Sequence, residues 1–336
     1  MKSGQLWLRI YGAGFVVCFA FLVLTLLTPI PYGDVTRVGR ISETEFTGRR
    51  PTPSIAAADL QSVPVDQADV LVIGDSFSIR FAWQSALVHA GYRVVTTHWD
   101  DTGPLCADFP DWLRRSGFRG RFVIVESVER LLPDRLKEAE GCAHMSLPFQ
   151  AIQRANLPSA DTAEPSWADL NWNAEWISGW LTYLHTREIR NATAPVRFSH
   201  PRWGDLIVAR PLADGCREFS NRMCDKGLFL VDDDRNPELM PESVAFMKRF
   251  VANAAPTRVI WMVIPNKTTV YVKPHHAHRF VQAFDAAALG PDLFAFAAAA
   301  RRRVMDLYSP NDTHLSLDGY LAFGAPMLKA VQEAGQ

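Results

Sequence analysis

The longest apolar stretch of the chain lies near its N-terminus and limits how the protein can fold. Residues 10–30 read IYGAGFVVCFAFLVLTLLTPI, a run of 21 residues without a charged side chain. About 20 apolar residues are enough for an α-helix to cross the hydrocarbon core of a bilayer. A cleaved signal peptide usually has a shorter apolar core and a small-x-small cleavage site, and no clear one follows this run. The stretch therefore predicts a retained, single-pass membrane anchor rather than a buried core helix.

The charged residues around the anchor do not fix its orientation. Lys2 and Arg9 precede the apolar run, and four arginines follow it by position 50. Because the side richer in basic residues tends to stay in the cytoplasm, this count does not favour an outward-facing C-terminus.

Over the whole chain 35 basic residues balance 36 acidic ones without a long basic run, so nucleic-acid binding has little support.

The five cysteines favour an oxidising compartment. Cys18 lies within the apolar run, and the other four form an even set outside it. An even set is typical of disulfides in exported proteins, and four cysteines allow three pairings. Of these we favour Cys106–Cys142 and Cys216–Cys224. The Cys-x-x-Cys spacing that is typical of zinc sites does not occur in the sequence, so we expect no metal.

From residue 68 onward, short apolar runs alternate with segments of helical pattern. Strands separated by helices in this way favour a mainly parallel sheet with helices on both faces, so the predicted fold class is α/β. The strands are expected at 69–74, 92–97, 122–126 and 258–264 with a short one at 294–296, and the helices at 78–90, 109–116, 241–254, 277–288 and 317–333.

The composition divides the chain into three parts. Residues 1–30 hold the membrane anchor, and residues 31–67 are polar and contain several prolines, as in a linker or stalk. Residues 68–336 carry the alternation of strands and helices and are expected to form one domain. Scattered prolines and a tryptophan cluster interrupt this alternation, so we expect an insertion around 145–215.

A serine follows the first predicted strand of this domain. Asp75 and Ser76 stand directly after the apolar run 70–74, and a helix is predicted to begin behind them. At that place the serine hydroxyl lies near a helix N-terminus, where free amides and the helix dipole stabilise a developing oxyanion. The alternative is that Asp75 and Ser76 only cap the helix. Because the loops after parallel strands meet at one edge of a sheet, Ser76 is expected to lie near Glu126 and Asn266.

A histidine and a carboxylate near the C-terminus can activate that serine. Asp312 and His314 are two residues apart, just before the last predicted helix. A serine nucleophile needs a base to accept its proton, and the base needs a carboxylate that orients it and stabilises the imidazolium. The alternative is an ordinary turn in which Asp312 is a capping residue. The two segments together predict a triad of Ser76, His314 and Asp312.

The serine and histidine segments resemble those of the SGNH/GDSL hydrolase superfamily. The closer resemblance is to its membrane-tethered branch, the alginate O-acetyltransferase-like proteins that acetylate exported polysaccharides. It covers most of the chain from residue 31 onward and is weakest over 145–210. The segments that carry it are PYGDVTRVG at 31–39, GDSFS at 74–78 with Trp83 and Gln84, VESVER at 125–130, PNKTTVY at 265–271 and NDTHLS at 311–316.

The resemblance implies an SGNH-like three-layer fold and a role for each residue of the triad. Ser76 is then the nucleophile, His314 the general base and acid, and Asp312 the orienting carboxylate. The resemblance also implies that Lys267, Thr269 and Tyr271 orient the substrate or donate to the oxyanion. The alternative for these three is a surface loop with a snorkelling lysine.

Two features depart from the pattern of the superfamily. Its members use a glycine and an asparagine from two middle segments in the oxyanion hole, and neither has a clear counterpart here. Glu126 and Ser127 stand roughly where the glycine should fall, which makes Ser127 a candidate. Leu315 stands where many members of the branch have a tryptophan, which bears on contacts with the acceptor. Arg80, one helical turn after Ser76 in the predicted helix, is a candidate for binding an anionic sugar.

The function that the resemblance implies is an O-acetyltransferase that modifies an exported or cell-surface polysaccharide through an acyl-serine. It needs no cofactor. Its partners are the polysaccharide acceptor and a multi-pass membrane acyltransferase that supplies acetyl groups. The implied location is the bacterial inner membrane, crossed once, with the catalytic domain in the periplasm. The alternatives are a periplasmic carbohydrate acetylesterase of the same fold and a non-catalytic glycan-binding or assembly subunit.

Two further clusters have less specific interpretations. Trp172, Trp176 and Trp180 repeat every four residues and share a face if they lie on one helix. Such a stripe is more often core packing than a platform for sugars. The histidines of the segment 275–278 have no carboxylate close in sequence to complete a metal site, so exposed histidines are the expected state.

Overall fold

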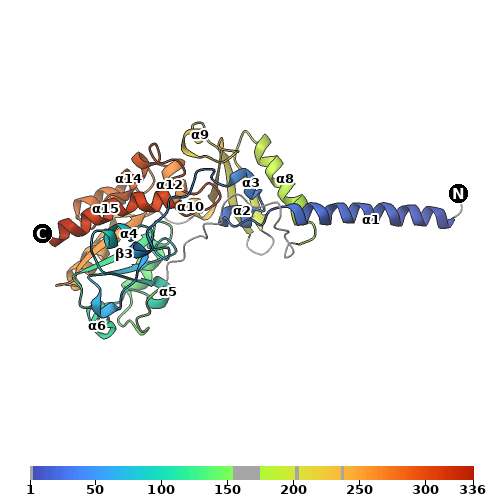
Figure 1. Cartoon of the computed structure of the whole chain (residues 1–336). Helices are drawn as coiled ribbons and strands as arrows, with labels where there is room; N and C mark the ends of the chain where they lie inside the picture. The colour runs from blue at the N-terminus through green and yellow to red at the C-terminus, as the bar shows by residue number, and fades with distance from the viewer. Residues whose placement is uncertain (1–2, 154–174, 201–203, 236–237) are drawn as a thin grey trace. The chain divides into compact units, whose positions relative to one another are not determined.

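The computed structural model describes residues 3–153, 175–200, 204–235 and 238–336 (Figure 1). The chain divides into two compact units. The first contains residues 1–50, 160–231 and 309–313, and the second contains 51–159, 232–308 and 314–336.

The second unit is built on a four-stranded sheet with the order β2-β1-β3-β7. The strands are β1 (Val70–Gly74), β2 (Val94–His98), β3 (Phe122–Val128) and β7 (Arg258–Ile264). Every neighbouring pair is parallel, which confirms the predicted α/β class with a mainly parallel sheet. All residues of β1 and β3 are buried, as expected for strands of a parallel sheet covered on both faces; β1 is apolar throughout, and β3 also buries Glu126 and Ser127. The carboxyl ends of the strands therefore share one edge.

Helices of the second unit pack on this sheet and on one another. Phe250 of α11 lies 5.7 Å from Trp261 of β7 between ring centroids, and α15 also contacts β7. Figure 1 shows α14 and α15 side by side. The helices are α4 (Ser85–His89), α5 (Trp99–Thr102), α6 (Phe109–Ser116), α7 (Leu132–Glu140), α10 (Asp232–Arg235), α11 (Pro241–Asn253), α12 (Lys267–Tyr271), α13 (His278–Ala286), α14 (Leu293–Ala300) and α15 (Leu317–Gly335).

Two predicted elements differ from the structure. The helix predicted over 78–90 begins only at Ser85, because residues 76–84 form turns in which Phe81 takes a left-handed φ of 54°. The short strand predicted at 294–296 is part of α14, in keeping with the high helix propensity of its alanines.

The first unit contains a three-stranded antiparallel sheet that the sequence analysis did not predict. Its order is β4-β5-β6, and its core includes Val35, Phe46 and Phe198. Parts of the ranges treated above as linker and insertion are thus folded together here. The elements are α1 (Ser3–Leu27), α2 (Asp34–Gly39), α3 (Glu43–Phe46), α8 (Ser178–Asn191), β4 (Val196–His200), β5 (Gly204–Pro211), α9 (Gly215–Glu218) and β6 (Lys226–Leu230).

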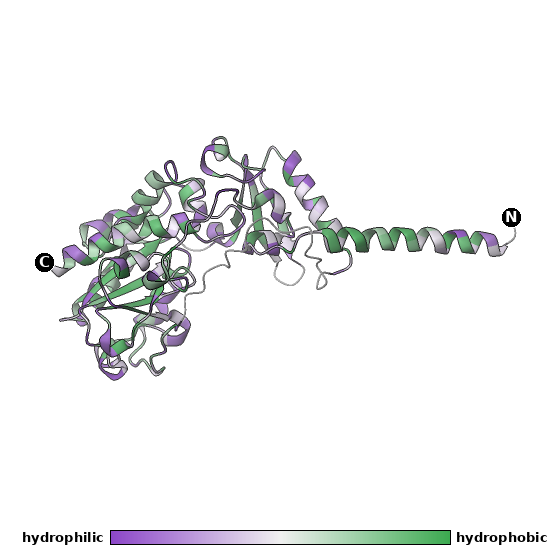
Figure 2. Cartoon of the chain, in the orientation of Figure 1, coloured by the Kyte–Doolittle hydropathy of each residue, from purple (hydrophilic) through white to green (hydrophobic). Residues whose placement is uncertain are grey.

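The N-terminal helix α1 is apolar along most of its length, as Figure 2 shows. It has 25 residues, and its most apolar window has a mean hydropathy of 2.4 and is 6% buried. Among the described residues it is the one helix long and apolar enough to cross a membrane. The predicted N-terminal apolar helix is therefore confirmed.

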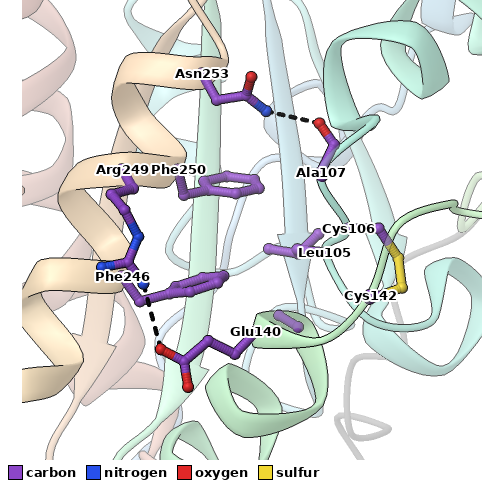
Figure 3. Close-up of a pocket in the computed structure, with 10 residues that line it drawn as sticks. Leu105, Cys106, Ala107, Glu140, Cys142, Phe246, Arg249, Phe250 and Asn253 are labelled. Carbon is purple, nitrogen blue, oxygen red and sulfur yellow. Dashed lines mark hydrogen bonds and ion pairs between the residues drawn. A yellow bond between two sulfur atoms is a disulfide. The ribbon is translucent and has the colours of Figure 1, made fainter.

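Both predicted disulfides are present, Cys106–Cys142 in the second unit and Cys216–Cys224 in the first. Cys18 is a free thiol on the exposed surface of α1. Figure 3 shows the first disulfide beside α11, where Arg249 pairs with Glu140 at 3.3 Å and the Asn253 amide donates to the Ala107 carbonyl at 2.8 Å. The small cavity at this place, of about 210 Å³, is lined by none of the candidate site residues.

Removing the first disulfide should destabilise the protein more than removing the second. The bridged cysteines are 36 residues apart in the first and 8 in the second. The chain-entropy relation then gives losses of about 4 and about 2.5 kcal/mol in the free energy of unfolding. Urea denaturation of the Cys106→Ser/Cys142→Ser and Cys216→Ser/Cys224→Ser variants measures both. An equal or larger loss for the second pair would contradict this ranking.

Candidate active site

A tight turn after β1 carries Ser76. The Asp75 carbonyl accepts the Ser78 amide at 2.8 Å, and its Oδ1 accepts the Phe77 amide at 3.0 Å. Gly74 ends the strand, and a Cβ there would lie 2.3 Å from the Ser78 Oγ, so a larger residue does not fit. Asp75 is thus the capping residue of the turn, and Ser76 is left partly exposed.

His314 lies within hydrogen-bonding distance of this serine. Its Nε2 is 2.7 Å from the Ser76 Oγ, and its ring packs against Phe77 with 4.7 Å between centroids. Leu315 forms an antiparallel bridge with Tyr308, and the Ser316 hydroxyl caps α15 by accepting the Gly319 amide at 3.1 Å. The bridge and the cap hold the backbone directly after His314.

The sequence analysis expected a helix N-terminus beside Ser76 that would stabilise a developing oxyanion, and this prediction is wrong. No helix begins behind Ser76, because α4 starts nine residues later, at Ser85. The amides of Phe77 and Ser78 are already bonded to Asp75. Trp83 and Gln84, which the sequence analysis noted without a role, donate to the Ser78 hydroxyl and carbonyl at 3.2 and 2.7 Å. They therefore stabilise the turn.

The loop that contains Asp312 is held within the first unit. The Asp312 Oδ2 accepts the Asp34 amide at 3.3 Å, and the Asp34 carboxylate accepts the Thr313 amide at 2.8 Å and bonds its hydroxyl. Asn311 donates to the carboxylate of Glu43, whose pKa is raised by burial. Asp34 belongs to the segment 31–39 that carried part of the resemblance, but the sequence analysis gave it no role. Asp312 itself stands two residues before His314 in the chain.

Buried charges lie behind the serine turn. The Asp75 Oδ2 accepts the Val128 amide at 3.0 Å and the Arg135 guanidinium at 2.9 Å. Burial opposes ionisation of Asp75, but Arg135 and these amides outweigh it and lower its pKa. Burial, followed by the charge of Asp75, raises the pKa of Glu126 well above its ordinary value. The Glu126 Oε2 accepts the Asp75 amide at 2.9 Å and the Ser78 hydroxyl at 2.7 Å.

Ser127 takes part in this buried network. Its Oγ accepts the Arg135 guanidinium at 2.7 Å and lies 3.1 Å from the Val128 carbonyl. The residue is 1% exposed. These contacts give its hydroxyl a structural role, and the geometry does not support the predicted role as an oxyanion donor.

The segment after β7 is a buried helix, α12, rather than a surface loop. Lys267 is only 1% exposed, which rules out a snorkelling lysine. The Thr269 hydroxyl donates to the Glu129 Oε2 at 2.6 Å, and the Tyr271 hydroxyl accepts the Tyr308 amide at 3.4 Å. Arg80, the candidate for binding an anionic sugar, is partly exposed, and its guanidinium lies 5.8 Å from the centre of the Tyr320 ring.

Glu129 is the buried acid beside α12. Its Oε2 also accepts the Asn266 amide at 2.8 Å, and its Oε1 is 3.7 Å from the Nε2 of His276. Burial raises the pKa of Glu129 from 4.5 to about 7, and repulsion by Asp233 adds to the rise. The Asn266 side chain, which accepts the Arg130 amide at 3.2 Å, ties the two strand ends together.

Glu129 should make the stability of the protein fall between pH 5 and 7. Its pKa is about 7 in the folded chain and 4.5 unfolded, so its stabilisation is complete below pH 4.5 and lost as the pH rises through 7. This pKa difference corresponds to about 3 kcal/mol. Glu129→Gln should flatten the decline in urea denaturation measured across this range, whereas Glu242→Gln, at an exposed site of α11, should leave it unchanged. An unaltered decline in Glu129→Gln would contradict the assignment.

The contact between Ser76 and His314 has the clearest chemistry of this site. A hydroxyl on an imidazole nitrogen can pass its proton to that nitrogen and attack a carbonyl carbon. Comparisons of the chain with protein-family models, with curated proteins and with solved structures found no match.

Proposed function

We propose that the protein is a serine-dependent O-acyltransferase that transfers acetyl groups to hydroxyls of an exported or cell-surface polysaccharide. Its fold is then the three-layer SGNH-like fold, in the membrane-tethered alginate O-acetyltransferase-like branch. The observation that carries the proposal is the 2.7 Å contact between the Ser76 Oγ and the His314 Nε2 at the carboxyl end of β1. The edge of a parallel sheet where strands end is the usual place for such a site.

In the first half of the reaction, Ser76 becomes acetylated. Its Oγ attacks the carbonyl carbon of an activated acetyl group while the His314 Nε2 accepts the hydroxyl proton. The tetrahedral intermediate collapses as His314 returns this proton to the leaving group, and an acetyl-serine remains. Asp312, two residues before His314, is the carboxylate assigned to orient the imidazole and stabilise its cationic form.

In the second half, a sugar hydroxyl attacks the acetyl-serine. His314 accepts the proton of that hydroxyl and delivers it to the Ser76 Oγ, which leaves as the free serine. The products are an acetylated glycan and the starting enzyme. Water in place of the sugar gives acetate instead, which is the reaction of an esterase.

The proposed location is supported by α1 and by the cysteines. One apolar helix anchors the chain in the bacterial inner membrane, and the two disulfides are compatible with a periplasmic catalytic domain. A single helix cannot carry acetyl groups across a bilayer. A multi-pass membrane acyltransferase is therefore the proposed source of the donor.

The balance of transfer and hydrolysis tests this proposal. The full-length chain in detergent, given p-nitrophenyl acetate, should release nitrophenol and form acetylated product when a periplasmic oligosaccharide is added, with a matching fall in free acetate. Acetate release that is indifferent to the oligosaccharide would identify an esterase. Nitrophenol release equal to that of Ser76→Ala would identify a non-catalytic subunit and contradict acyl chemistry.

A further inference from the structure

The end of α1 is joined to α8 by close contacts within the first unit. The Thr25 hydroxyl donates to the Trp176 carbonyl at 2.7 Å and accepts the Gly179 amide at 3.2 Å. A Cβ at Gly179 would lie 2.7 Å from the Cα of Thr25, so only glycine permits this approach. The N-terminal end of α8 is therefore fixed at the last turns of α1, where the apolar helix ends at Leu27.

Large aromatic side chains gather where the two helices meet. Phe21 of α1 contacts Trp176 and Trp180, with ring centroids 6.1 and 5.6 Å apart, and Trp180 stacks on Tyr183 at 5.3 Å. Trp176 is 54% exposed and Tyr183 48%, although the unit has a separate buried core. These rings thus pack on the apolar helix and still present much of their surface outward.

The aromatic face continues into a basic one. Trp180, Tyr183 and Arg187 follow at helical spacing, so they share one face of α8, with Arg190 one turn further on. Arg187 is exposed, and Arg190 lies 3.5 Å from Glu45 with 57% of its side chain exposed. A groove of about 340 Å³ runs beside them, lined by Leu24 and Leu27 of α1 and, among others, by Tyr183, Arg187 and Arg190.

This order of side chains matches the order of layers at a membrane surface. Tryptophan and tyrosine concentrate where the hydrocarbon core meets the headgroups, and arginine binds phosphate through its planar guanidinium. Phe21 lies six residues before the end of α1, about 9 Å along the helix. If the helix leaves the bilayer at Leu27, Phe21 lies just inside the hydrocarbon core, because the headgroup layer is about 5–7 Å thick. Arg187 and Arg190 lie toward the C-terminal end of α8, away from the end that Gly179 fixes to α1, whereas Trp180 lies next to that fixed end.

We propose that the face of α8 formed by Trp180, Tyr183, Arg187 and Arg190, together with Trp176 just before the helix, rests on the bilayer that α1 enters. Its rings lie among the headgroups, and its two arginines bind the phosphates of phospholipids. The occupant of the groove is thus phospholipid. The inference depends on α1 crossing the membrane and does not depend on the acyl chemistry. In this arrangement the first unit contacts the membrane directly through α8, in addition to its attachment through α1.

Fluorescence quenching in liposomes tests this contact with the full-length chain. Cys18, the thiol outside both disulfides, is first labelled with an environment-sensitive dye and should be quenched by lipids with a nitroxide deep in the acyl chain. In a Cys18→Ser background, the same dye is then placed at Tyr183→Cys and, as a matched control, at Thr193→Cys, an exposed site just past the end of α8.

The dye at Tyr183→Cys should be quenched by lipids with a nitroxide near the headgroup at least about threefold more than the dye at Thr193→Cys. Equal quenching at the two sites would overturn the proposal, and so would a Cys18 label that the deep nitroxide does not quench.

Adding Arg187→Glu to Tyr183→Cys should lower the quenching by the nitroxide near the headgroup, whereas adding Glu188→Gln should not. No change with Arg187→Glu would overturn the phosphate contact. Thermal melts of the variants show that loss of quenching does not arise from unfolding.

Discussion

Replacing Ser76 with alanine should abolish the release of nitrophenol from an activated acetyl ester, with kcat falling by about 10³ to 10⁶. The reason is geometric, because Ser76 supplies the oxygen that lies 2.7 Å from the His314 Nε2. Without this oxygen no acetyl-serine can form, and His314 can at best activate water. In cells the same variant should lack glycan acetylation at an unchanged protein level.

The matched control for this variant is Ser116→Ala. Ser116 is partly buried, and its hydroxyl donates to the Leu113 carbonyl at 2.7 Å on α6, so its removal changes the same number of atoms in the same unit. Its kcat should equal that of the wild type. Activity of Ser76→Ala equal to that of Ser116→Ala would show that another group carries the reaction.

Removing the charge of Arg135 should cause a large loss of stability in the second unit. Arg135→Met leaves the ionised Asp75 buried without its partner, because the two side chains are 2.9 Å apart and only 13% and 3% exposed. A buried ion pair that loses one partner costs about 3–5 kcal/mol in the free energy of unfolding. Since Asp75 also holds the serine turn, kcat should fall as well at temperatures where the variant is folded.

The pair of Arg114 and Asp111 provides the control for that substitution. It is 2.6 Å apart, but the side chains are 77% and 54% exposed, so water screens the charges. Arg114→Met should therefore change the free energy of unfolding by less than about 1 kcal/mol. Urea denaturation compares the two variants, and equal losses would contradict the view that Asp75 depends on Arg135.

The parallel sheet and the Ser76–His314 contact could be predicted because their signals are local. Continuous apolar runs mark β1 and β7, and each site segment is a short string beside a strand or a helix. The parallel arrangement then brings the two segments together although 238 residues separate them. The disulfides could be predicted for a similar reason, since an even set of four cysteines leaves few pairings.

The remaining features depend on distant partners or on weak patterns. The strands β4, β5 and β6 were missed; β4 is only five residues long, and prolines stand directly before and after it in the sequence. Turns over 76–84 replace the first part of a predicted helix, because Phe81 takes a left-handed φ of 54°, which a right-handed helix cannot contain. The raised pKa of Glu129 comes from burial in the folded chain and from the charge of Asp233, which is about a hundred residues further along, so no local pattern reveals it.

Labelling with a fluorophosphonate tests the central claim most directly, because this reagent forms a stable bond with an activated serine oxygen. Peptide mapping by mass spectrometry should find one adduct on Ser76, and His314→Ala should lower its rate of formation by at least about 100-fold. An adduct on Ser76 that forms equally fast without His314, or no adduct there while ester turnover persists, would contradict the account.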